Sequence, residues 1–150
     1  MSAKASANDI AEAVGEAMYE RDIAAQSLDI TLEEIRPGYA RMTMPVRPDM
    51  INGHDLGHGG FTFALADTAF AYACNSYNQV SVAHIAEITF ITGARNGDLL
   101  TAEAEERAFA GRSGTFDVTV TNQKGEKIAL FRGHSRSIKG AVVPELPITR

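Results

Sequence analysis

The stretch GGFTFALADTAFAYAC at residues 59–74 decides how this chain folds, because it is almost entirely apolar and contains a single charged residue. We interpret it as a central apolar helix. That charged residue is Asp67, and helical spacing gives it these apolar neighbours: Phe63, Ala64, Phe70, Ala71 and Cys74. A carboxylate on such a face loses its hydration unless it is paired, which carries a large cost in free energy.

Two interpretations of Asp67 follow from this setting. In the first, the helix is only partly buried and the carboxylate is simply solvated. In the second, Asp67 is a catalytic carboxylate, because Leu or Ala would pack at the same place without the cost of desolvation. The sequence favours the second interpretation.

The length and composition are those of a soluble globular protein. The chain has 150 residues, of which 45% are hydrophobic and 22% are charged, which suits one domain with a real core. The net charge of −5 argues against a nucleic-acid partner, because nucleic-acid binders need basic patches. The only cysteine, Cys74, excludes an intrachain disulfide and a multi-cysteine zinc site, and we expect it to be buried.

The sequence predicts no association with membranes. No apolar run approaches the length of a membrane span, and residues 1–10 lack the apolar core of a signal peptide. We therefore expect a cytoplasmic location.

The chain before the apolar helix predicts one helix, two strands and a loop. Residues 8–21 carry an apolar stripe at helical spacing, with Asn8 or Asp9 as the N-cap. A turn at Pro37-Gly38 separates two alternating segments, and a loop follows them. These segments and the loop span residues 28–35, 39–46 and 48–57.

After the apolar helix the pattern changes to that of strands joined by short turns, over residues 81–91, 99–109, 114–122 and 127–138. Such short turns favour antiparallel pairing. The small Ala and Gly side chains of the apolar helix let a curved sheet approach it closely. We therefore predict an α+β fold in which an antiparallel curved sheet wraps around one helix. The single domain, 1–150, would include an N-terminal helical segment, 1–25, and a loose tail, 140–150.

The start of the apolar helix, His58-Gly59-Gly60, suggests a place for an oxyanion. The first N–H groups of a helix have no internal partner, and glycines let a ligand oxygen approach them. A plain glycine-rich helix entry is the alternative. Gly59 and Asp67 are eight positions apart, roughly 12 Å along a helix, so one chain cannot easily place both on one carbonyl. Two antiparallel helices in a dimer could, which suggests a site shared across a two-fold interface.

Two further polar residues near the helix start have more than one interpretation. His54 and His58 could form a zinc site with Asp67, but the residues between the two histidines resemble a loop, so we predict no metal site. We expect His58 to fix the loop by hydrogen bonds. Asn52 could bind a ligand or tie down the turn.

This region resembles a known family. The matching runs are RPDMINGH (47–54), HGG (58–60), LAD (65–67), AFA (69–71), ACNS (73–76), GD (97–98) and ALFRG (129–133). They are similar to the hotdog-fold thioesterases of the PaaI type, which act in phenylacetic acid degradation, and the resemblance covers nearly all of the chain. The combination of HGG with LAD is specific within hotdog proteins, whereas HGG alone is not.

The resemblance implies a thioesterase that cleaves aryl- or phenylacetyl-CoA, including substrates like hydroxyphenylacetyl-CoA, as a homotetramer built from two hotdog dimers. It makes Asp67 the nucleophile or general base and the Gly59 N–H the group that polarises the thioester carbonyl. It assigns Asn52 and His58 to orienting the substrate or the catalytic loop.

The resemblance also implies substrate-binding residues, which are Gly60, Ala83, His84 and Arg112. In related thioesterases a Ser or Thr on the strand after the helix assists the catalytic carboxylate. Here the corresponding residue is Ala83, flanked by Ser81 and His84. The phosphates of CoA need cations, for which the surface candidates are Arg95, Arg112 and Lys124.

The chemistry of a thioester agrees with these residues. Its carbonyl is already electrophilic and thiolate leaves readily, so one carboxylate and one oxyanion donor suffice and no metal or redox cofactor is needed. Two other functions stay open. One is a hotdog dehydratase or hydratase that uses His58 and Asp67 as an acid–base pair, and the other is a non-catalytic acyl-CoA-binding module.

Overall fold

Six antiparallel strands form a single sheet in the computed structural model, which describes residues 4–150. The strands are β1 (Thr31–Arg36), β2 (Tyr39–Pro45), β3 (Gln79–Phe90), β4 (Leu99–Ala110), β5 (Ser113–Thr121) and β6 (Lys127–Ala141). Their order across the sheet is β1-β2-β4-β5-β6-β3. The predicted strands and their antiparallel pairing are confirmed.

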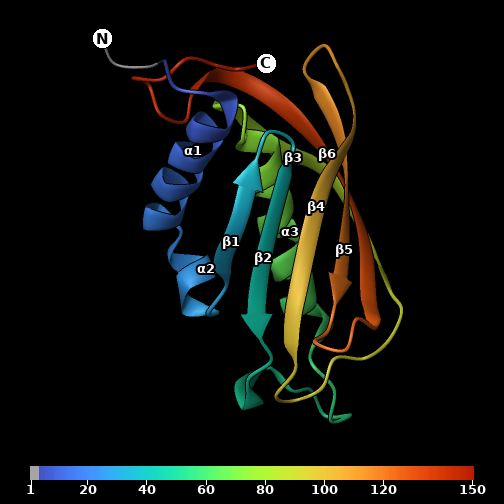
Figure 1. The fold of residues 1–150 in the computed structure, drawn as a ribbon. Helices are drawn as coiled ribbons and strands as arrows, with labels where there is room; N and C mark the ends of the chain where they lie inside the picture. Colours follow the sequence, from blue (N-terminus) through green and yellow to red (C-terminus); the bar gives the residue numbers. More distant parts are fainter. Residues whose placement is uncertain (1–3) are drawn as a thin grey trace.

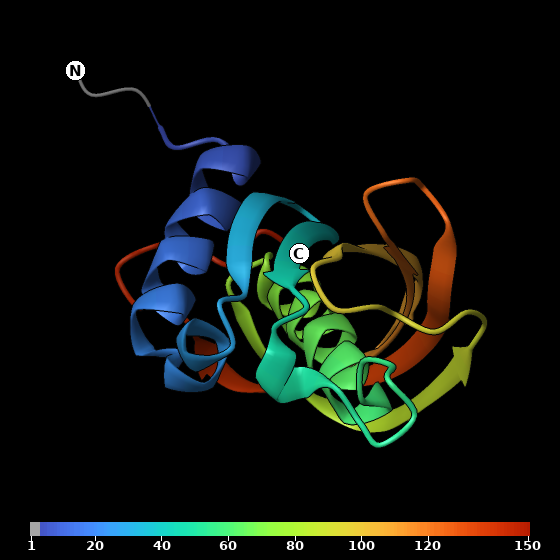
Figure 2. The ribbon, with the colours of Figure 1, turned by 90° about the horizontal axis from the view of Figure 1, so that it is seen from below.

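Helix α3 (Gly59–Asn75) lies in the hollow of this curved sheet (Figures 1 and 2) and has the bounds that the apolar stretch indicates. The predicted hotdog arrangement, a curved antiparallel sheet around a central helix, is therefore confirmed. Small residues allow the close contact between the two layers. A Cβ atom on Gly133 of β6 would lie 2.8 Å from the Phe70 ring of α3, so a larger residue there would push the helix away.

The core forms between α3 and the inward faces of the strands. Alternate residues of β2 and β5 point to the helix and are almost fully buried: Ala40, Met42, Met44, Phe116, Val118 and Val120. This confirms the alternation read from the sequence. Cys74 is buried, as expected, and burial raises the pKa of its thiol to about 12, which leaves it unreactive at neutral pH.

Two helices cover the β1 side of the molecule (Figure 2), and they differ in part from the prediction. Helix α1 (Ala7–Arg21) is capped by Ser6, not by Asn8 or Asp9. The Asp9 N–H donates to the Ser6 side chain and the Asp9 carboxylate accepts from the Ser6 N–H, which is a capping box. The first three residues of the predicted segment 1–25 lie outside the described part of the chain.

The short helix α2 (Ile23–Ser27) begins within the predicted N-terminal helical segment and extends two residues beyond it, and a turn at residues 28–30 delays the strand predicted at 28–35 until Thr31. Asp22 caps α2 by accepting from the Ala25 N–H, and its other carboxylate oxygen accepts from the Tyr72 hydroxyl of α3 at 3.0 Å. Burial together with this carboxylate raises the pKa of Tyr72. One aspartate therefore ends α1, starts α2 and ties both to the central helix.

The C-terminal tail is held in place, so the prediction of a loose tail is wrong. Strand β6 continues to Ala141, and the Asn78 side-chain amide then donates to the Val143 and Leu146 carbonyls at 3.0 and 2.9 Å. The Thr149 N–H donates to the Tyr77 carbonyl. A buried asparagine just after α3 replaces the missing regular structure with side-chain hydrogen bonds.

Strand β3 is an edge strand, and almost its whole length is open to solvent in the single chain. Its exposed residues include large apolar side chains, and the exposed fractions of Val82, Ile85 and Phe90 are 45%, 55% and 55%. A long apolar edge of this kind is a template for pairing with another strand. No helix within residues 4–150 is both long enough and apolar enough to cross a membrane.

Candidate functional site

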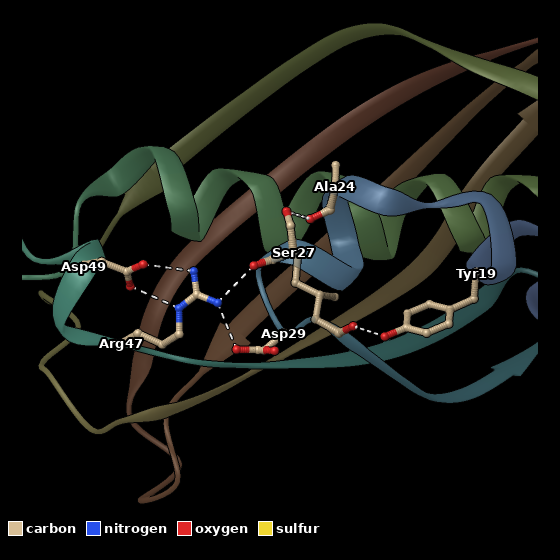
Figure 3. A network of polar contacts seen from close by, with 7 residues as sticks. Tyr19, Ala24, Ser27, Asp29, Arg47 and Asp49 are labelled. Carbon is tan, nitrogen blue, oxygen red and sulfur yellow. Dashed lines mark hydrogen bonds and ion pairs between the residues drawn. The ribbon is translucent and has the colours of Figure 1, made fainter.

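The chain enters α3 through a loop that is fixed at several points. Arg47, just after β2, donates to the Asp29 carboxylate at 2.8 Å and to the Ser27 carbonyl at 2.9 Å, and it also pairs with Asp49 at 3.0 Å (Figure 3). These contacts attach the start of the loop to the end of α2. The loop then passes through a short 3-10 helix, Pro48–Met50, before it turns back toward α3.

Asn52 ties down the turn in this loop. Its side-chain oxygen accepts from the N–H groups of His54 and Leu56 at 2.9 and 3.2 Å, and its own N–H donates to the Leu56 carbonyl. This is the structural one of the two roles that the sequence left open. Its side-chain NH₂ has no hydrogen-bond acceptor within residues 4–150, so that group is available for a ligand.

His58 fixes the start of α3, as predicted. Its N–H donates to the Met50 carbonyl at 2.7 Å, and its Nδ1 accepts from the Gly60 N–H at 3.0 Å. Because Nδ1 is an acceptor here, the imidazole serves as the N-cap of the helix. The same bond occupies the Gly60 N–H, so Gly60 cannot offer that donor to a substrate.

The Gly59 N–H differs from that of its neighbour because no acceptor within residues 4–150 receives it. Gly59 is the first residue of α3, where the N–H points away from the helix and the helix dipole places partial positive charge. A Cβ atom at this position would lie 2.8 Å from the end of the Phe90 ring. The absence of a side chain therefore lets the Phe90 ring lie directly against the start of α3, beside this N–H.

A pocket of about 390 Å³ opens beside Gly59, and we call it the apolar pocket. Asn52, Gly57 and Gly59 line one side of it, and apolar residues from the end of β3 and the following loop line the other, among them Phe90, Ile91 and Ala94. The Gly57 N–H donates to the Ala94 carbonyl at 2.8 Å, which joins the two sides. Sequence patterns did not identify this apolar wall. Gly93, in the loop after β3, also lines the pocket, and a Cβ atom there would lie 2.8 Å from Leu56.

Asp67 lies in the middle of α3, partly buried, with no ion-pair or hydrogen-bond partner within residues 4–150. Burial alone raises the pKa of its carboxyl group. The residues around it on the same face, including Ala64, Thr68 and Ala71, are also only partly buried. They form a half-open stripe along the helix, so the carboxylate is shielded from water but can still be reached.

Asp67 and the helix start do not meet within one chain. Asp67 follows Gly59 by eight positions and His58 by nine, which places it roughly 12 to 14 Å along the helix axis from them. His58 and Asp67 therefore do not form an acid–base pair within one protomer. A site that uses both Asp67 and the Gly59 N–H therefore needs a second copy of the helix.

The other candidate residues lie apart from Asn52 and Gly59. Ala83 and His84 are exposed on the edge strand β3, where Ala83 pairs with Ser135 of β6. Ser81, beside them, is occupied: its hydroxyl lies 3.1 Å from the Gln79 carbonyl and 3.3 Å from the Ser137 hydroxyl. Arg112 lies in the β4–β5 turn, at the far end of the sheet from Gly59.

The histidines do not gather a metal-binding set. Within residues 4–150, no group of three or more His, Cys, Asp or Glu side chains is arranged to hold a metal ion. His58 is committed to capping the helix, and His54 is exposed in the loop.

Known proteins with the same organisation identify the family. The model of the Thioesterase superfamily matches residues 56–129. The acyl-coenzyme A thioesterase PaaI of Escherichia coli is 44% identical over 129 residues, covering 86% of this chain and 92% of that protein. The chain belongs to the thioesterase superfamily. As a member of that superfamily it is a thioester hydrolase.

Solved structures of thioesterase-superfamily proteins agree with this assignment. The structure of the E. coli PaaI protein from the phenylacetic acid degradation operon has a TM-score of 0.89, at 43% identity over 91% of this chain and 99% of that one. A mutant structure of the phenylacetic acid degradation protein PaaI from Thermus thermophilus has a TM-score of 0.75, at 32% identity over 78% of this chain and all of that one. The match extends over most of the chain.

Proposed function

We propose that this thioesterase hydrolyses acyl-CoA thioesters with arylacetyl groups, such as phenylacetyl- or hydroxyphenylacetyl-CoA, to the free acid and CoA. The observation that carries the proposal is the Asp67 carboxylate, which has no partner within residues 4–150 and whose pKa is raised by burial. A carboxylate that only stabilised the fold would be paired, whereas a base or nucleophile must stay free to react.

The apolar pocket supports the choice of acyl group. Its wall contains the Phe90 ring together with Ile91, Ala94 and Ile128, and it adjoins the Gly59 N–H. An aromatic acyl group bound there would place its carbonyl near that donor. The E. coli relative comes from a phenylacetic acid degradation operon, which agrees with an arylacetyl substrate.

In the proposed reaction the Gly59 N–H donates to the thioester carbonyl and stabilises the negative charge that develops on its oxygen. The Asp67 carboxylate either takes a proton from the attacking water or attacks the carbonyl carbon itself. The carbon–sulfur bond then breaks and CoA leaves as a thiolate, which takes up a proton. If Asp67 is the nucleophile, the acyl group remains on its carboxylate as a mixed anhydride, and water hydrolyses this anhydride to release the acid. Asn52 contributes by fixing the loop that holds Gly59 and by offering its free NH₂ to the substrate.

We propose that each active site is shared by two protomers of a homodimer, and that two such dimers form a tetramer. The exposed edge strand β3 supports this, because antiparallel pairing with a second β3 would cover its apolar side chains and bring two α3 helices side by side. Asp67 of one protomer would then face Gly59 of its partner.

A thiol-release assay over a panel of acyl-CoA thioesters tests the activity and its acyl preference. We expect the highest kcat/KM with arylacetyl-CoA and lower values with short straight-chain acyl-CoA. Equal values across the panel would contradict the acyl preference, and no thiol release with any thioester would contradict the activity.

A pair of Gly59 variants tests the oxyanion donor. Gly59→Pro removes the N–H at the first helical position, which tolerates proline, and His58 already has the extended backbone (ψ 130°) that a following proline requires. Gly59→Ala is the matched control, because it adds the same Cβ atom near Phe90 but keeps the N–H. We expect the alanine variant to stay active and the proline variant to lose activity, and equal activity in the two would exclude Gly59 as the donor.

Mixing inactive variants tests the shared site. If Asp67→Ala and Gly59→Pro are refolded together, half of randomly paired dimers are mixed and each has one intact site, so activity should return to about a quarter of wild type. Each variant refolded alone is the control. No recovery, with subunit exchange verified, would contradict the shared site.

A further inference from the structure

A second pocket, with a volume of about 520 Å³, lies beyond the C-terminal end of α3, and we call it the basic pocket. Its polar wall consists of Gln79, Ser137 and three cationic side chains, Arg112, Lys139 and Arg150. No Asp or Glu is among its lining residues. In a chain with a net charge of −5, a pocket with only positive charge indicates an anionic ligand.

Arg150 does not contribute a free charge to this pocket. Its guanidinium pairs with Glu106 and lies over the rings of Tyr77 and Phe109, 3.7 and 3.5 Å from the two ring centres. Arg150 therefore forms a fixed wall, and the remaining cations are Arg112 and Lys139.

Arg112 and Lys139 are exposed and have no carboxylate partner within residues 4–150. Six other arginines of the chain do form ion pairs: Arg36, Arg41, Arg47, Arg107, Arg132 and Arg150. The Ser137 N–H donates to the Arg112 carbonyl at 2.7 Å, which fixes the backbone of Arg112 beside the end of β6 that carries Lys139. The two free cations thus come from neighbouring parts of one rigid sheet.

The basic pocket also lies at a suitable distance from the chemistry. A narrow cleft next to it shares Gln79, Ser137 and Arg150 with it and is lined by Cys74. Cys74 follows Asp67 by seven positions on α3, roughly 10 Å along the axis. In a CoA thioester the long pantetheine arm separates the reacting carbonyl from the phosphates, so a thioester at Asp67 would place its phosphates well away from α3.

We propose that the basic pocket binds the phosphate groups of the CoA moiety, with Arg112 and Lys139 as their ligands. This rests on the proposed function, because it takes the thioester at Asp67 to be a CoA thioester. A guanidinium offers two parallel donors to a phosphate and an ammonium offers a compact charge, so the pair suits a group with several negative oxygens. The pocket then selects CoA thioesters over thioesters that lack the nucleotide.

Two substrates separate this role from a general effect on catalysis. Arylacetyl-CoA carries the phosphates, and the matching arylacetyl-pantetheine has the same thioester without them. We expect Arg112→Ala and Lys139→Ala each to raise KM for arylacetyl-CoA by about tenfold, because each removes a charge-assisted hydrogen bond, with kcat unchanged. KM for arylacetyl-pantetheine should be the same in the variants and the wild type.

Matched controls remove one positive charge elsewhere. Lys127→Ala lies at the other end of β6 from Lys139, and Arg21→Ala removes an exposed arginine from α1. Neither should change KM for either substrate. Inorganic phosphate should compete poorly with arylacetyl-CoA, whereas free CoA should compete well, if the pocket recognises phosphates carried by CoA.

Several results would overturn the proposal. One is an unchanged KM for arylacetyl-CoA in both variants, which would mean that the basic pocket binds free phosphate or no anion at all. Another is an equal rise in KM for arylacetyl-pantetheine. A third is a rise in KM for arylacetyl-CoA that occurs only in Arg95→Ala or Lys124→Ala, which would place the phosphates of CoA at the opposite end of the sheet.

If the wild type hydrolyses neither substrate, that result contradicts the proposed function but does not test the basic pocket. A binding measurement then tests the pocket directly. Titration calorimetry of free CoA into the intact protein gives Kd without any reaction. Weaker binding of CoA to Arg112→Ala and Lys139→Ala, with normal binding to the two controls, would support the basic pocket. Equal Kd values in all five proteins, or no detectable binding of CoA to any of them, would overturn it.

Discussion

Asp67 on α3 and Asp117 on β5 are both partly shielded from water, yet their surroundings are opposite. Asp117 accepts from Arg132 at 2.6 Å and from Arg107 at 3.1 Å, and these guanidinium groups lower the pKa of its carboxyl group. Asp67 has no such partner within residues 4–150, and burial raises the pKa of its carboxyl group. The free energy lost by shielding a charge is offset at Asp117 and is not offset at Asp67.

The difference indicates what each carboxylate does. Asp117 joins side chains from β4 and β6 across the outer face of the sheet, so its charge stabilises the fold. Asp67 is partly buried without a partner, and burial raises the pKa of its carboxyl group, which is the usual pattern at active sites. The same residue type is thus paired in one place and unpaired in the other, and the position of the arginines decides which carboxylate is left for the proposed chemistry.

The largest expected effect is on turnover. Asp67→Asn should lower kcat for the best acyl-CoA substrate by about 10² to 10⁴, because it removes the base or nucleophile. Asp117→Asn, the matched change on β5, should leave kcat nearly unchanged. Steady-state thiol release measures both. If kcat of Asp67→Asn stays close to that of the wild type, the reactive role of Asp67 is wrong.

Stability should change in opposite directions. Asp117→Asn should lower the free energy of unfolding at pH 7 by about 1 kcal/mol, since it weakens a partly exposed ion-pair network. Asp67→Asn should raise the free energy of unfolding, because it removes an uncompensated charge. Urea unfolding followed by circular dichroism measures both variants. A loss of stability in Asp67→Asn would show that its carboxylate has a stabilising partner after all.

These two stability differences have opposite signs, and both should be largest at neutral pH and shrink in acid. The native pKa of Asp67 is raised above 3.8, so its ionisation cost is absent below pH 3.8 and grows as pH rises through the raised value. The native pKa of Asp117 is lowered, so its stabilisation is present above pH 3.8 and is lost as pH falls through the lowered value. Thermal unfolding of the wild type and both variants between acid and neutral pH should show both differences shrinking in acid, and a constant difference would contradict the assignment.

The smallest expected effect is that of chelation. If neither carboxylate holds a metal ion, EDTA should leave kcat unchanged, and metal analysis of the pure protein should find no stoichiometric zinc. Activity that falls with EDTA and returns with added zinc would assign the histidines a role that the geometry does not suggest.

Periodic features of the sequence predicted most of the fold. The bounds of α3, the alternation in β2 and β5, and the short turns between strands depend on residues close together in the chain, so local patterns are sufficient. The corrections have another origin. Ser6 as the cap of α1, the short helix α2 and the held C-terminal tail depend on side-chain hydrogen bonds, and in the tail these join residues as far apart as Asn78 and Leu146.

For the site, the sequence by itself identified Asp67 as the candidate reactive group, because one charged residue in an apolar helix is visible without any structure. It also placed Gly59 at the start of that helix. Only the tertiary structure decided that the Gly60 N–H is occupied by His58 while the Gly59 N–H is free, and that Asn52 ties down a turn. It also decided that Arg112 lies beside Lys139 at the far end of α3. The physical reason is that composition and hydrophobic periodicity reflect how deeply each residue is buried. Hydrogen bonds and ion pairs between distant segments form only when those segments pack together.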